Sequence, residues 1–273
     1  MPINRKTSRL LNSPYVAWAV IFIIVPLFMV FYYGFTDDSG SFTFDNVAAI
    51  ASPEHMHSLL LAVALSVVST VICFILAYPL GMILARNKAS NRSMIITLFI
   101  LPMWMNFLLR TLAWMTLLEN KGVINGVLDF LHLPGINIIN TPAAIVIGMV
   151  YNFLPFMILP IYNSLSSIDD SVIFAARDLG ADSKQTFFKV TLPLTVPGII
   201  SGVTMVFIPA LTTFAISTML GGSKILLIGN VIEQEFTLSY DWNLGSGLSI
   251  VLMVFIIINI VVSSISDKKG EES

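Results

Sequence analysis

Charged residues are scarce in this chain, and their scarcity argues against an ordinary soluble domain. Only 11% of the 273 residues are Asp, Glu, Lys or Arg, and 56% are hydrophobic, whereas about 25% of a typical soluble domain is charged. The formal net charge of −2 also excludes the basic footprint of a nucleic-acid-binding protein. Apolar runs of about 20 residues, long enough to cross a bilayer, recur along the chain. We therefore expect residues 1–273 to form a single membrane domain.

Chemically reactive patterns are also missing. Cys73 is the one cysteine, so it forms no internal disulfide and is expected to be a small buried hydrophobe. The apolar runs carry no paired carboxylates, no Ser-His-Asp set and no His-Glu-x-x-His pattern. The stretch from Gly221 to Lys224 lacks the spacing of a phosphate-binding loop. We expect no catalytic residue, metal or cofactor on this chain, so energy must come from a partner.

Six apolar runs predict an all-α integral membrane protein with six transmembrane helices. The predicted spans are Tyr15 to Phe35, Leu59 to Ala85, Met94 to Leu118, Pro142 to Asn163, Thr195 to Leu220 and Leu244 to Ile265. An even number of spans places both termini on the same side of the membrane. That side also receives eleven of the thirteen loop cations considered, namely Arg5, Lys6, Arg9, Arg86, Lys88, Arg92, Arg177, Lys184, Lys189, Lys268 and Lys269. Because Lys and Arg concentrate in cytoplasmic loops, both termini and the segment 164–194 are predicted to be cytoplasmic.

The connections predicted on the outer side are longer and acidic, which suggests that they receive a partner from outside. The first carries Asp37, Asp38, Asp45 and Glu54, and the last carries Glu233, Glu235 and Asp241. The segment from Lys224 to Phe236 mixes aliphatic and polar residues, so we expect a short helix lying at the membrane interface. The stretch from Val123 to Leu133 shows the same pattern.

Polar and aromatic side chains deep in the predicted spans are candidates for a substrate pathway. Trp104 is expected near the middle of the bilayer, where its indole either packs against another helix or faces a watery path. Asn152, beside Tyr151, is expected to be similarly deep and to face protein or a cavity rather than lipid. An amide at this depth either joins two helices or contacts substrate, and the sequence leaves both roles open.

Arg110 is the one ionised side chain inside a predicted span, which makes it a functional candidate. Its predicted depth favours a guanidinium that reaches the outer headgroups, and a role in an outer gate is the alternative. Asp241, in the last acidic connection, completes the set of candidate pathway residues. The full set is Trp104, Tyr151, Asn152, Arg110 and Asp241.

The polar segment from Ser171 to Pro193 is ordered as a compact helix-turn-helix. Its alanines and Leu179 favour a helix, and Gly180 adopts without strain the left-handed conformation that ends one. Asp182 or Ser183 is expected to cap a second helix, and Leu192 with Pro193 to stop it. A loop that only joins two spans needs none of these features, so we interpret the segment as a contact surface.

This segment resembles the cytoplasmic EAA loop of bacterial ABC-importer permeases. The residues that match that loop, and that the resemblance implies contact the ATPase, are Ala175, Ala176, Gly180, Val190, Leu192 and Pro193. Phe174 occupies the position where the family usually has Glu, which removes one polar contact. In that family the first helix of the loop docks into a cleft of the cytoplasmic ATPase.

Other stretches resemble the B-type permease subunits of spermidine/putrescine importers. They are Leu101 to Asn106 with Arg110, Leu154 to Met157, Ala175 to Ala181, Gly221-Gly222, Leu227 to Ile232, and Asp241-Trp242. The resemblance implies a type I ABC-importer (MetI-like) permease fold in the bacterial inner membrane. It also implies a second homologous permease, two copies of an ATPase holding ATP and Mg, and an external polyamine-binding protein.

Two alternatives remain at this point. An ABC permease for another solute, such as sulfate, iron or thiamine, shares the EAA-like loop. A secondary transporter would need no ATPase, but that loop and the lack of a buried acidic relay argue against it.

Overall fold

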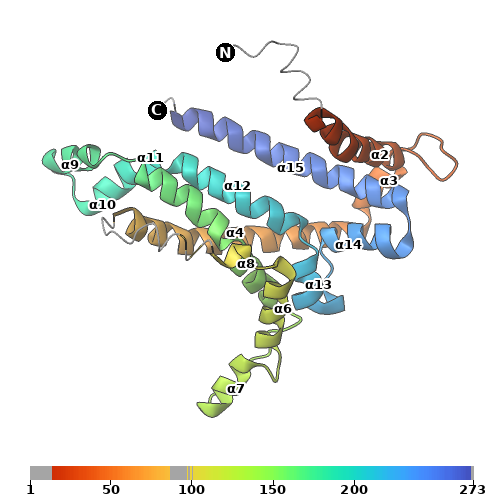
Figure 1. The fold of residues 1–273 in the computed structure, drawn as a ribbon, viewed down its shortest axis with the longest axis horizontal. Coiled ribbons are helices and arrows are strands. Elements are labelled where there is room, and N and C mark those ends of the chain that lie inside the picture. The colour runs from red at the N-terminus through yellow and green to blue at the C-terminus, as the bar shows by residue number, and fades with distance from the viewer. Residues whose placement is uncertain (1–13, 87–96, 98, 100, 272–273) are drawn as a thin grey trace, which may run out of the picture. The chain divides into compact units, whose positions relative to one another are not determined.

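The computed structural model describes residues 14–86, 97, 99 and 101–271, and it is helical almost throughout (Figure 1). Among these residues, extended pairing is limited to one isolated bridge between Thr36 and Phe42. The described chain divides into two compact units. Unit 1 comprises Met1–Met56 and Val231–Phe255, and unit 2 comprises His57–Asn230 and Ile256–Ser273. Met94, where the third predicted span starts, and the cations Arg5, Lys6, Arg9, Lys88 and Arg92 lie outside the described residues.

Unit 1 combines the first apolar helix with the helix that follows the last connection. Its elements are η1 (Val20–Ile24), α2 (Val25–Gly34), α3 (Asp45–Ala48), η2 (Ala49–Ala51), the start of α4 (Pro53–Arg86), the end of α14 (Ile228–Gln234), η6 (Glu235–Ser239) and the first part of α15 (Trp242–Glu271). Asn46 joins α3 to the end of the first helix, because its side-chain amide donates to the Thr36 carbonyl at 2.8 Å. A π-helical turn at η1 precedes Pro26, whose missing N–H is tolerated in the first turn of α2.

Unit 2 is built around α8 and contains the remaining elements. They are α4 beyond its first turn, η3 (Leu101–Trp104), α6 (Phe107–Leu118), α7 (Val123–Phe130), α8 (Pro142–Ser166), α9 (Asp170–Asp178), α10 (Ser183–Thr186), η4 (Phe187–Thr191), α11 (Leu192–Leu194), α12 (Val196–Thr212), α13 (Ala215–Gly221), η5 (Gly222–Lys224), the start of α14, and the end of α15. Figure 1 shows α9 and α10 at one end of unit 2, with α13 towards the other.

Small residues allow the helices around α8 to approach closely. A Cβ atom placed on Gly198 of α12 would lie 2.4 Å from the Ser164 Cβ of α8, so any larger residue there would push the helices apart. On the α4 side, the Ser69 hydroxyl donates to the Met149 sulfur at 3.3 Å. Cys73 is completely buried, as predicted. The core of unit 2 is therefore a tight contact of α8 with α4 and α12.

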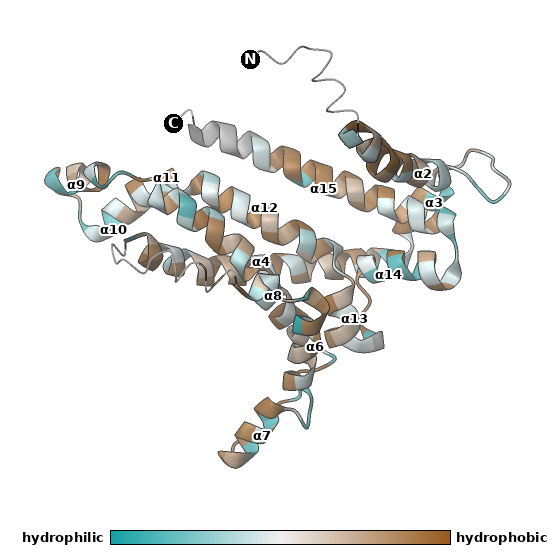
Figure 2. Ribbon diagram, in the orientation of Figure 1, coloured by the Kyte–Doolittle hydropathy of each residue, from teal (hydrophilic) through white to brown (hydrophobic). Residues whose placement is uncertain are grey.

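Four helices among the described residues are long and apolar enough to cross a membrane. They are Pro14–Gly34, Pro53–Arg86, Pro142–Ser166 and Trp242–Ser264, close to four of the six predicted spans. A fifth candidate is the bent pair Ser183–Leu194 and Val196–Thr212, whose axes differ by 61°. Figure 2 shows hydrophobic colouring along most of α2, α12 and α15, and hydrophilic residues on α9 and the turn after it. A total of six spans stays a prediction.

Two predicted spans are not continuous helices. In the third, the described chain breaks at Met105, and the Asn106 side chain caps α6 by accepting from the Leu108 N–H at 2.8 Å. In the fifth, α12 ends at Thr212, and an extended Thr213 separates it from α13. The first break escapes hydropathy because a single polar cap lies inside an apolar run, and the second is not marked by a side-chain cap within its own run.

Candidate functional site

The polar segment folds as two helices joined by a tight turn, as the sequence predicts. Asp169 caps α9 by accepting a hydrogen bond from the Ser171 N–H at 2.8 Å. This backbone hydrogen bond holds the pKa of the Asp169 carboxyl below its usual range. After α9, Gly180 adopts φ +88°, a left-handed conformation that strains residues with a Cβ atom. Its N–H donates to the Arg177 carbonyl at 2.9 Å and closes the turn.

The second helix of the segment begins as predicted but does not stop where predicted. Asp182 and Gln185 form a capping box, in which the Gln185 N–H donates to the Asp182 carboxylate at 2.7 Å. The helix then runs through η4 and α11 to Leu194. Pro193 does not end it, because proline is tolerated in the first turn of the short helix α11. The predicted Leu192-Pro193 stop is therefore wrong, and the chain bends at Thr195.

The bend at Thr195 is fixed to α4 by a residue that the sequence did not single out. Thr195 is completely buried, and its hydroxyl lies 2.9 Å from the Tyr78 hydroxyl of α4. The Tyr78 ring also meets Phe187 edge to face, with ring centroids 5.8 Å apart. Tyr78 therefore joins the base of the second helix to one of the long helices, and only a long-range contact identifies it.

The first helix of the segment presents apolar side chains to its surroundings. Phe174 is 58% exposed and Leu179 is 90% exposed, although both are large and apolar. Ala175 is also exposed, and Ala176 is half-buried. A cavity of about 470 Å³ opens beside α9, lined by Phe174 and by Arg86 at the end of α4.

The remaining matches to the EAA-like loop lie in the second helix, away from this exposed face. Val190 and Leu192 are half-buried, and Pro193 is exposed. The predicted contact residues therefore separate into an exposed group on α9 and a stem that continues into α12.

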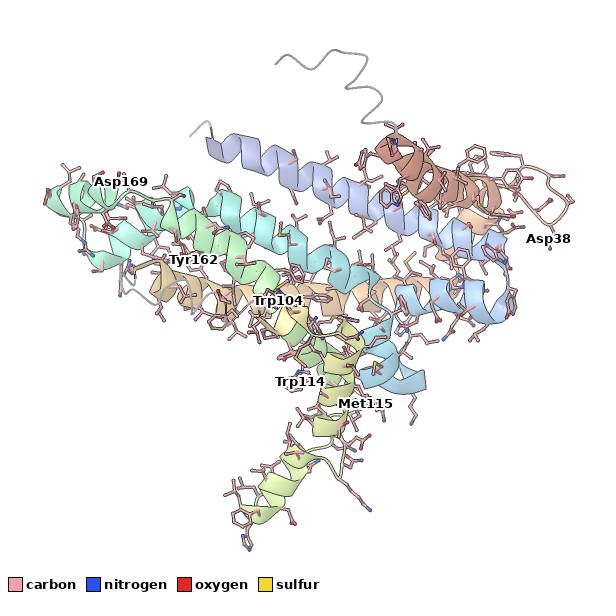
Figure 3. The ribbon with its side chains drawn as sticks, viewed as in Figure 1. Asp38, Trp104, Trp114, Met115, Tyr162 and Asp169 are labelled. Carbon is pink, nitrogen blue, oxygen red and sulfur yellow. The ribbon has the colours of Figure 1, made fainter. Side chains whose placement is uncertain are left out.

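Trp104 and Arg110 flank the break before α6 but differ in exposure. Trp104 ends η3, just before α6 (Figure 3). It is 82% exposed, so its ring is not packed against a helix of the described chain. Arg110 is only 8% exposed, and its Nε and Nη1 atoms have no hydrogen-bond partner. The predicted reach to the outer headgroups is therefore wrong, because a guanidinium at a headgroup is exposed. A buried guanidinium with two unpaired nitrogens is costly in a low-dielectric interior.

Tyr151 lies where α8 meets α6, and Asn152 follows it on α8. The Tyr151 ring contacts Trp114 of α6 edge to face, with ring centroids 5.2 Å apart. Asn152 is almost completely buried, and its amide N–H donates to the Gly148 carbonyl of its own helix at 2.9 Å. Its side-chain oxygen has no partner among the described residues. Within the described chain, Asn152 thus forms no hydrogen bond to a second helix, and the sequence did not single out Trp114 as the neighbour of Tyr151.

Asn230 forms the most extensive side-chain hydrogen-bond group that we describe, and the sequence did not identify its role. Its oxygen accepts from the Ser217 hydroxyl at 2.5 Å and from the Leu227 N–H at 3.1 Å. Its amide N–H donates to the Phe214 carbonyl at 3.1 Å and to the Thr218 hydroxyl at 2.8 Å. This side chain therefore holds the break between α12 and α13 in place.

The same region corrects the prediction of an interface helix from Lys224 to Phe236. Leu227 and Ile228 are completely buried, and Asn230 is 2% exposed. A helix lying on a membrane surface keeps its polar face in water. The first part of this segment is instead packed inside unit 2.

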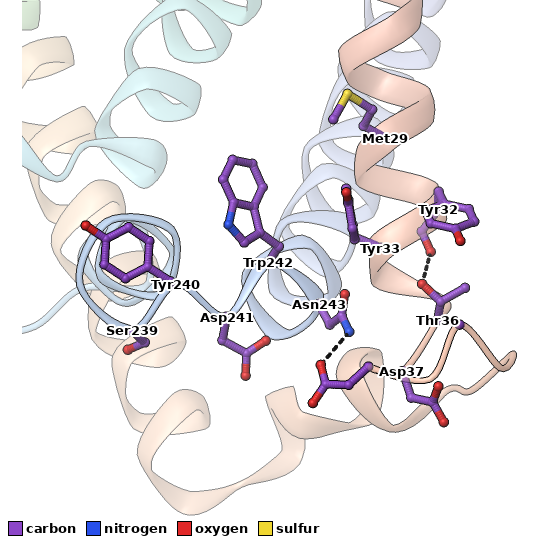
Figure 4. Close-up of a pocket in the computed structure, with 12 residues that line it drawn as sticks. Met29, Tyr32, Tyr33, Thr36, Asp37, Ser239, Tyr240, Asp241, Trp242 and Asn243 are labelled. Atoms are coloured by element: carbon purple, nitrogen blue, oxygen red, sulfur yellow. Dashed lines mark hydrogen bonds between the residues drawn. The ribbon is translucent and has the colours of Figure 1, made fainter.

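The last candidate, Asp241, belongs to unit 1 and lines a pocket of about 690 Å³ there. Figure 4 shows Tyr33, Tyr240 and Trp242 beside it. Asp241 also caps α15, because its carboxylate accepts from the Leu244 N–H at 2.8 Å. No group of three or more His, Cys, Asp or Glu in the described parts of the chain is placed to hold a metal ion.

Comparison with solved structures confirms the fold. The membrane chain is similar to a chain of a bacterial ABC transporter that imports the acidic polysaccharide alginate, with a TM-score of 0.81 at 18% identity, covering 97% of this chain and 96% of that chain. It is also similar to a chain of the MetNI methionine ABC transporter, with a TM-score of 0.58 at 19% identity, covering 79% of this chain and 95% of that one. The predicted MetI-like permease fold is therefore confirmed.

Sequence comparison gives much closer relatives. The chain is 36% identical over 269 residues to the spermidine/putrescine transport system permease protein PotB of Haemophilus influenzae, covering 95% of this chain and 94% of the relative. It is 38% identical over 247 residues to PotB of Escherichia coli K12, covering 88% of this chain and 90% of that protein.

A family model also matches residues 77–268, which include the helix-turn-helix segment, the Asn230 group and both helices that meet at Trp114. The description of that family agrees with the long apolar helices and with the fold. The chain belongs to the family of inner membrane components of binding-protein-dependent transport systems.

Proposed function

We propose that this chain is the membrane-spanning permease subunit of an ATP-driven importer of polyamines. The observation that carries the proposal is the identity of 36% and 38% to two PotB permeases over 95% and 88% of the chain. Both relatives are named for spermidine and putrescine transport. We infer the same substrate class for this chain, in which it forms half of the translocation pathway.

The proposed orientation places both termini and the helix-turn-helix segment in the cytoplasm. It is supported by the predicted excess of Lys and Arg on that side, to which Arg177, Lys184 and Lys189 of the segment contribute. The pocket beside Asp241 then faces the outside. The chain is a multi-pass protein of the bacterial inner membrane in this proposal.

The proposed coupling surface is the exposed apolar side of α9. Phe174 and Leu179 present large apolar side chains that a protein partner would cover. We propose that a cytoplasmic ATPase covers them, with Phe174 making an apolar contact where the family has a carboxylate. ATP and Mg are bound by that partner, and this chain performs transport without catalysis.

The complete importer in this proposal contains a second, homologous permease, two copies of the ATPase and an external polyamine-binding protein. A solved structural relative is an alginate ABC transporter in complex with a periplasmic protein that holds an alginate pentasaccharide. The acidic connection that begins at Asp37 is the proposed contact for the binding protein here. The second permease is expected to supply the carboxylates that the spans of this chain lack.

The decisive test is ATP-dependent uptake of labelled spermidine and putrescine into vesicles that hold the complete complex. We expect uptake that requires internal ATP and the binding protein, with unlabelled polyamines as effective competitors. Sulfate, iron and thiamine are expected not to compete. Competition by one of these solutes, or uptake driven by a proton gradient without ATP, would contradict the proposal.

The coupling surface has its own test in the turn after α9. Replacing Gly180 by Val is expected to abolish uptake while leaving the permease inserted, because a β-branched residue strains the left-handed turn. Gly126→Val is the matched control, since Gly126 has an ordinary φ and open space around its Cβ position. Normal uptake by the Gly180→Val complex would remove this turn from the coupling mechanism.

A further inference from the structure

The pocket in unit 1 is a cavity whose lining is aromatic and acidic (Figure 4). Its volume of about 690 Å³ lies within the range of about 300–1,000 Å³ that small-molecule sites occupy. One side is formed by the end of α2 and the loop after it, with Tyr33, Asp37 and Asp38. The other side is the turn before α15, with Tyr240, Asp241 and Trp242. No Lys or Arg is among the lining residues.

Specific contacts hold the two sides of the pocket together. The Asn243 amide donates to the Asp38 carboxylate at 3.2 Å. The Tyr33 and Trp242 rings lie 6.1 Å apart between centroids. Tyr240 adopts φ +56°, an uncommon conformation for a residue with a large side chain, and the residue is 72% exposed. Contacts within unit 1 therefore hold the shape of the pocket, and Tyr240 is exposed in it.

The carboxylates keep binding capacity after these contacts. The Oδ1 atom of Asp37 accepts from the N–H groups of Ser39 and Ser41, both at 2.9 Å. Asp38 and Asp241 likewise use Oδ1 for their hydrogen bonds to Asn243 and to the N–H of Leu244. The Oδ2 atoms of these three side chains make no hydrogen bond within the described chain. The Ser39 hydroxyl and the Ser41 N–H hold the pKa of Asp37 below its usual range, so this carboxyl is anionic at neutral pH.

Acidic groups and aromatic faces together match one class of ligand. An ammonium group is attracted by carboxylates and by the face of an aromatic ring, and methylene groups pack against the same rings. A compact metal ion does not fit, because the described acidic residues form no group placed to hold one. We propose that this pocket binds a linear organic polycation, with its ammonium groups at Asp38 and Asp241 and its carbon chain against Tyr240 and Trp242.

The identity of the polycation rests on the proposed function, which makes it a polyamine on the outer side of the membrane. The pocket is then an entry site that retains substrate before it reaches the transmembrane pathway. Such a site shares no residue with the other pathway candidates Trp104, Tyr151 and Asn152, which belong to unit 2.

The experiment observes the pocket directly through Trp242. The complete complex is labelled with 5-fluorotryptophan, and the Trp242 signal is assigned by its loss in Trp242→Phe. Spermidine is titrated into the complex without binding protein, and triethylene glycol is the uncharged control. We expect spermidine alone to shift the Trp242 signal. A Trp242 signal that does not respond to spermidine overturns the proposal.

Matched variants distinguish specific binding in the pocket from nonspecific attraction of a cation to an acidic surface. Asp38→Asn keeps an acceptor for Asn243 but removes one charge, so the titration midpoint is expected to rise roughly fivefold. Tyr240→Leu removes the exposed ring and is expected to raise it roughly threefold. Asp45→Asn removes a charge from the same connection without lining the pocket, so its midpoint is expected to match the wild type. Equal midpoints for Asp38→Asn and Asp45→Asn overturn the proposal.

Two further results distinguish this inference from the proposed function. A shift of the Trp242 signal by ligand-free binding protein, with none by spermidine, shows that the pocket receives a side chain of that protein and overturns the inference. Normal polyamine uptake with an unresponsive pocket overturns the inference alone. A pocket that binds spermidine in a complex that imports another solute overturns only the proposed function.

Discussion

Asn230 and Asn152 are both buried amides in unit 2, yet their surroundings differ completely. Asn230 uses both its oxygen and its nitrogen in hydrogen bonds to other segments. Asn152 donates once, to its own helix, and its oxygen has no partner. Arg110, on helix α6, likewise has two side-chain nitrogens without a hydrogen-bond partner among the described residues. Because buried polar groups are normally paired, the first amide belongs to the scaffold, and we expect the unpaired atoms to bond to water or to another subunit in the complete complex.

The sharpest test of this contrast is the removal of Asn230. Asn230→Ala leaves the Leu227 N–H without its partner and removes one of the hydrogen bonds to the Phe214 carbonyl, so we expect a loss of about 3 kcal/mol of unfolding free energy. Thermal unfolding of the complex in detergent measures it. Asn120→Ala, at an exposed position, is the control and is expected to leave the midpoint unchanged. A change of less than about 1 kcal/mol in Asn230→Ala would show that the group is not structural.

For the Arg110 guanidinium we expect the opposite result, in which stability is kept and uptake is lost. Arg110→Met removes a buried charge and keeps most of the side-chain volume, so the stability of the isolated chain is expected to stay the same or rise. Uptake by the complete complex is expected to fall roughly tenfold, because the guanidinium meets its partner only there. Unfolding and uptake are measured on the same preparations. A large loss of stability in the isolated chain would place the partner of Arg110 within this chain.

A smaller effect is expected at Asn152. Asn152→Leu removes an amide whose oxygen is already unpaired, so the change in unfolding free energy is expected to stay within about 1 kcal/mol. The same substitution at Asn230 should cost several times more, and the pair of values measures how far hydrogen-bond pairing determines the role of a buried amide. Reduced uptake in Asn152→Leu at unchanged stability would support a place in the pathway. Similar losses of stability in both variants would remove the distinction.

The smallest effect concerns the cap of α9, which is exposed. Because the pKa of Asp169 is lower in the folded protein, its cap stabilises α9 above the unfolded pKa and is lost only as pH falls through the folded value. The protection of the Ser171 N–H against hydrogen exchange, relative to its intrinsic rate at each pH, is expected to persist at neutral pH and to fall as pH drops through the folded pKa of Asp169. Asp169→Asn keeps an acceptor and should remove this pH dependence. Asp178→Asn, at the other end of the helix, should retain it.

The sequence predicted those features that depend on local chemistry. The long apolar runs matched four helices, and Gly180 and Asp182 took the turn and cap positions expected of them. Asn106 also had a local signal, because Asn is a frequent helix cap, but the apolar residues on both sides concealed it. The break at Thr213 had no such signal, since it depends on hydrogen bonds from a residue 16 positions away from Phe214.

The candidate site was predictable to a similar extent. The helix-turn-helix was recognised because its Gly and cap residues are close together in the chain. Tyr78 and Trp114 were not, because their roles depend on contacts with Thr195 and Tyr151 in other helices. Arg110 was misplaced because composition gives the depth of a side chain but not the direction in which it points. Long-range packing therefore accounts for most of what the sequence did not predict.

The bend at Thr195 determines how a force on the segment would act on the membrane helices. The axis of Ser183–Leu194 meets that of Val196–Thr212 at 61°, so a push along the first acts more across the second than along it. Tyr78 of α4 contacts Thr195 at this junction and is expected to keep the junction in place as a pivot. α12 is then expected to tilt about this point rather than slide through the bilayer, so that a small displacement near the junction becomes a larger one at its far end.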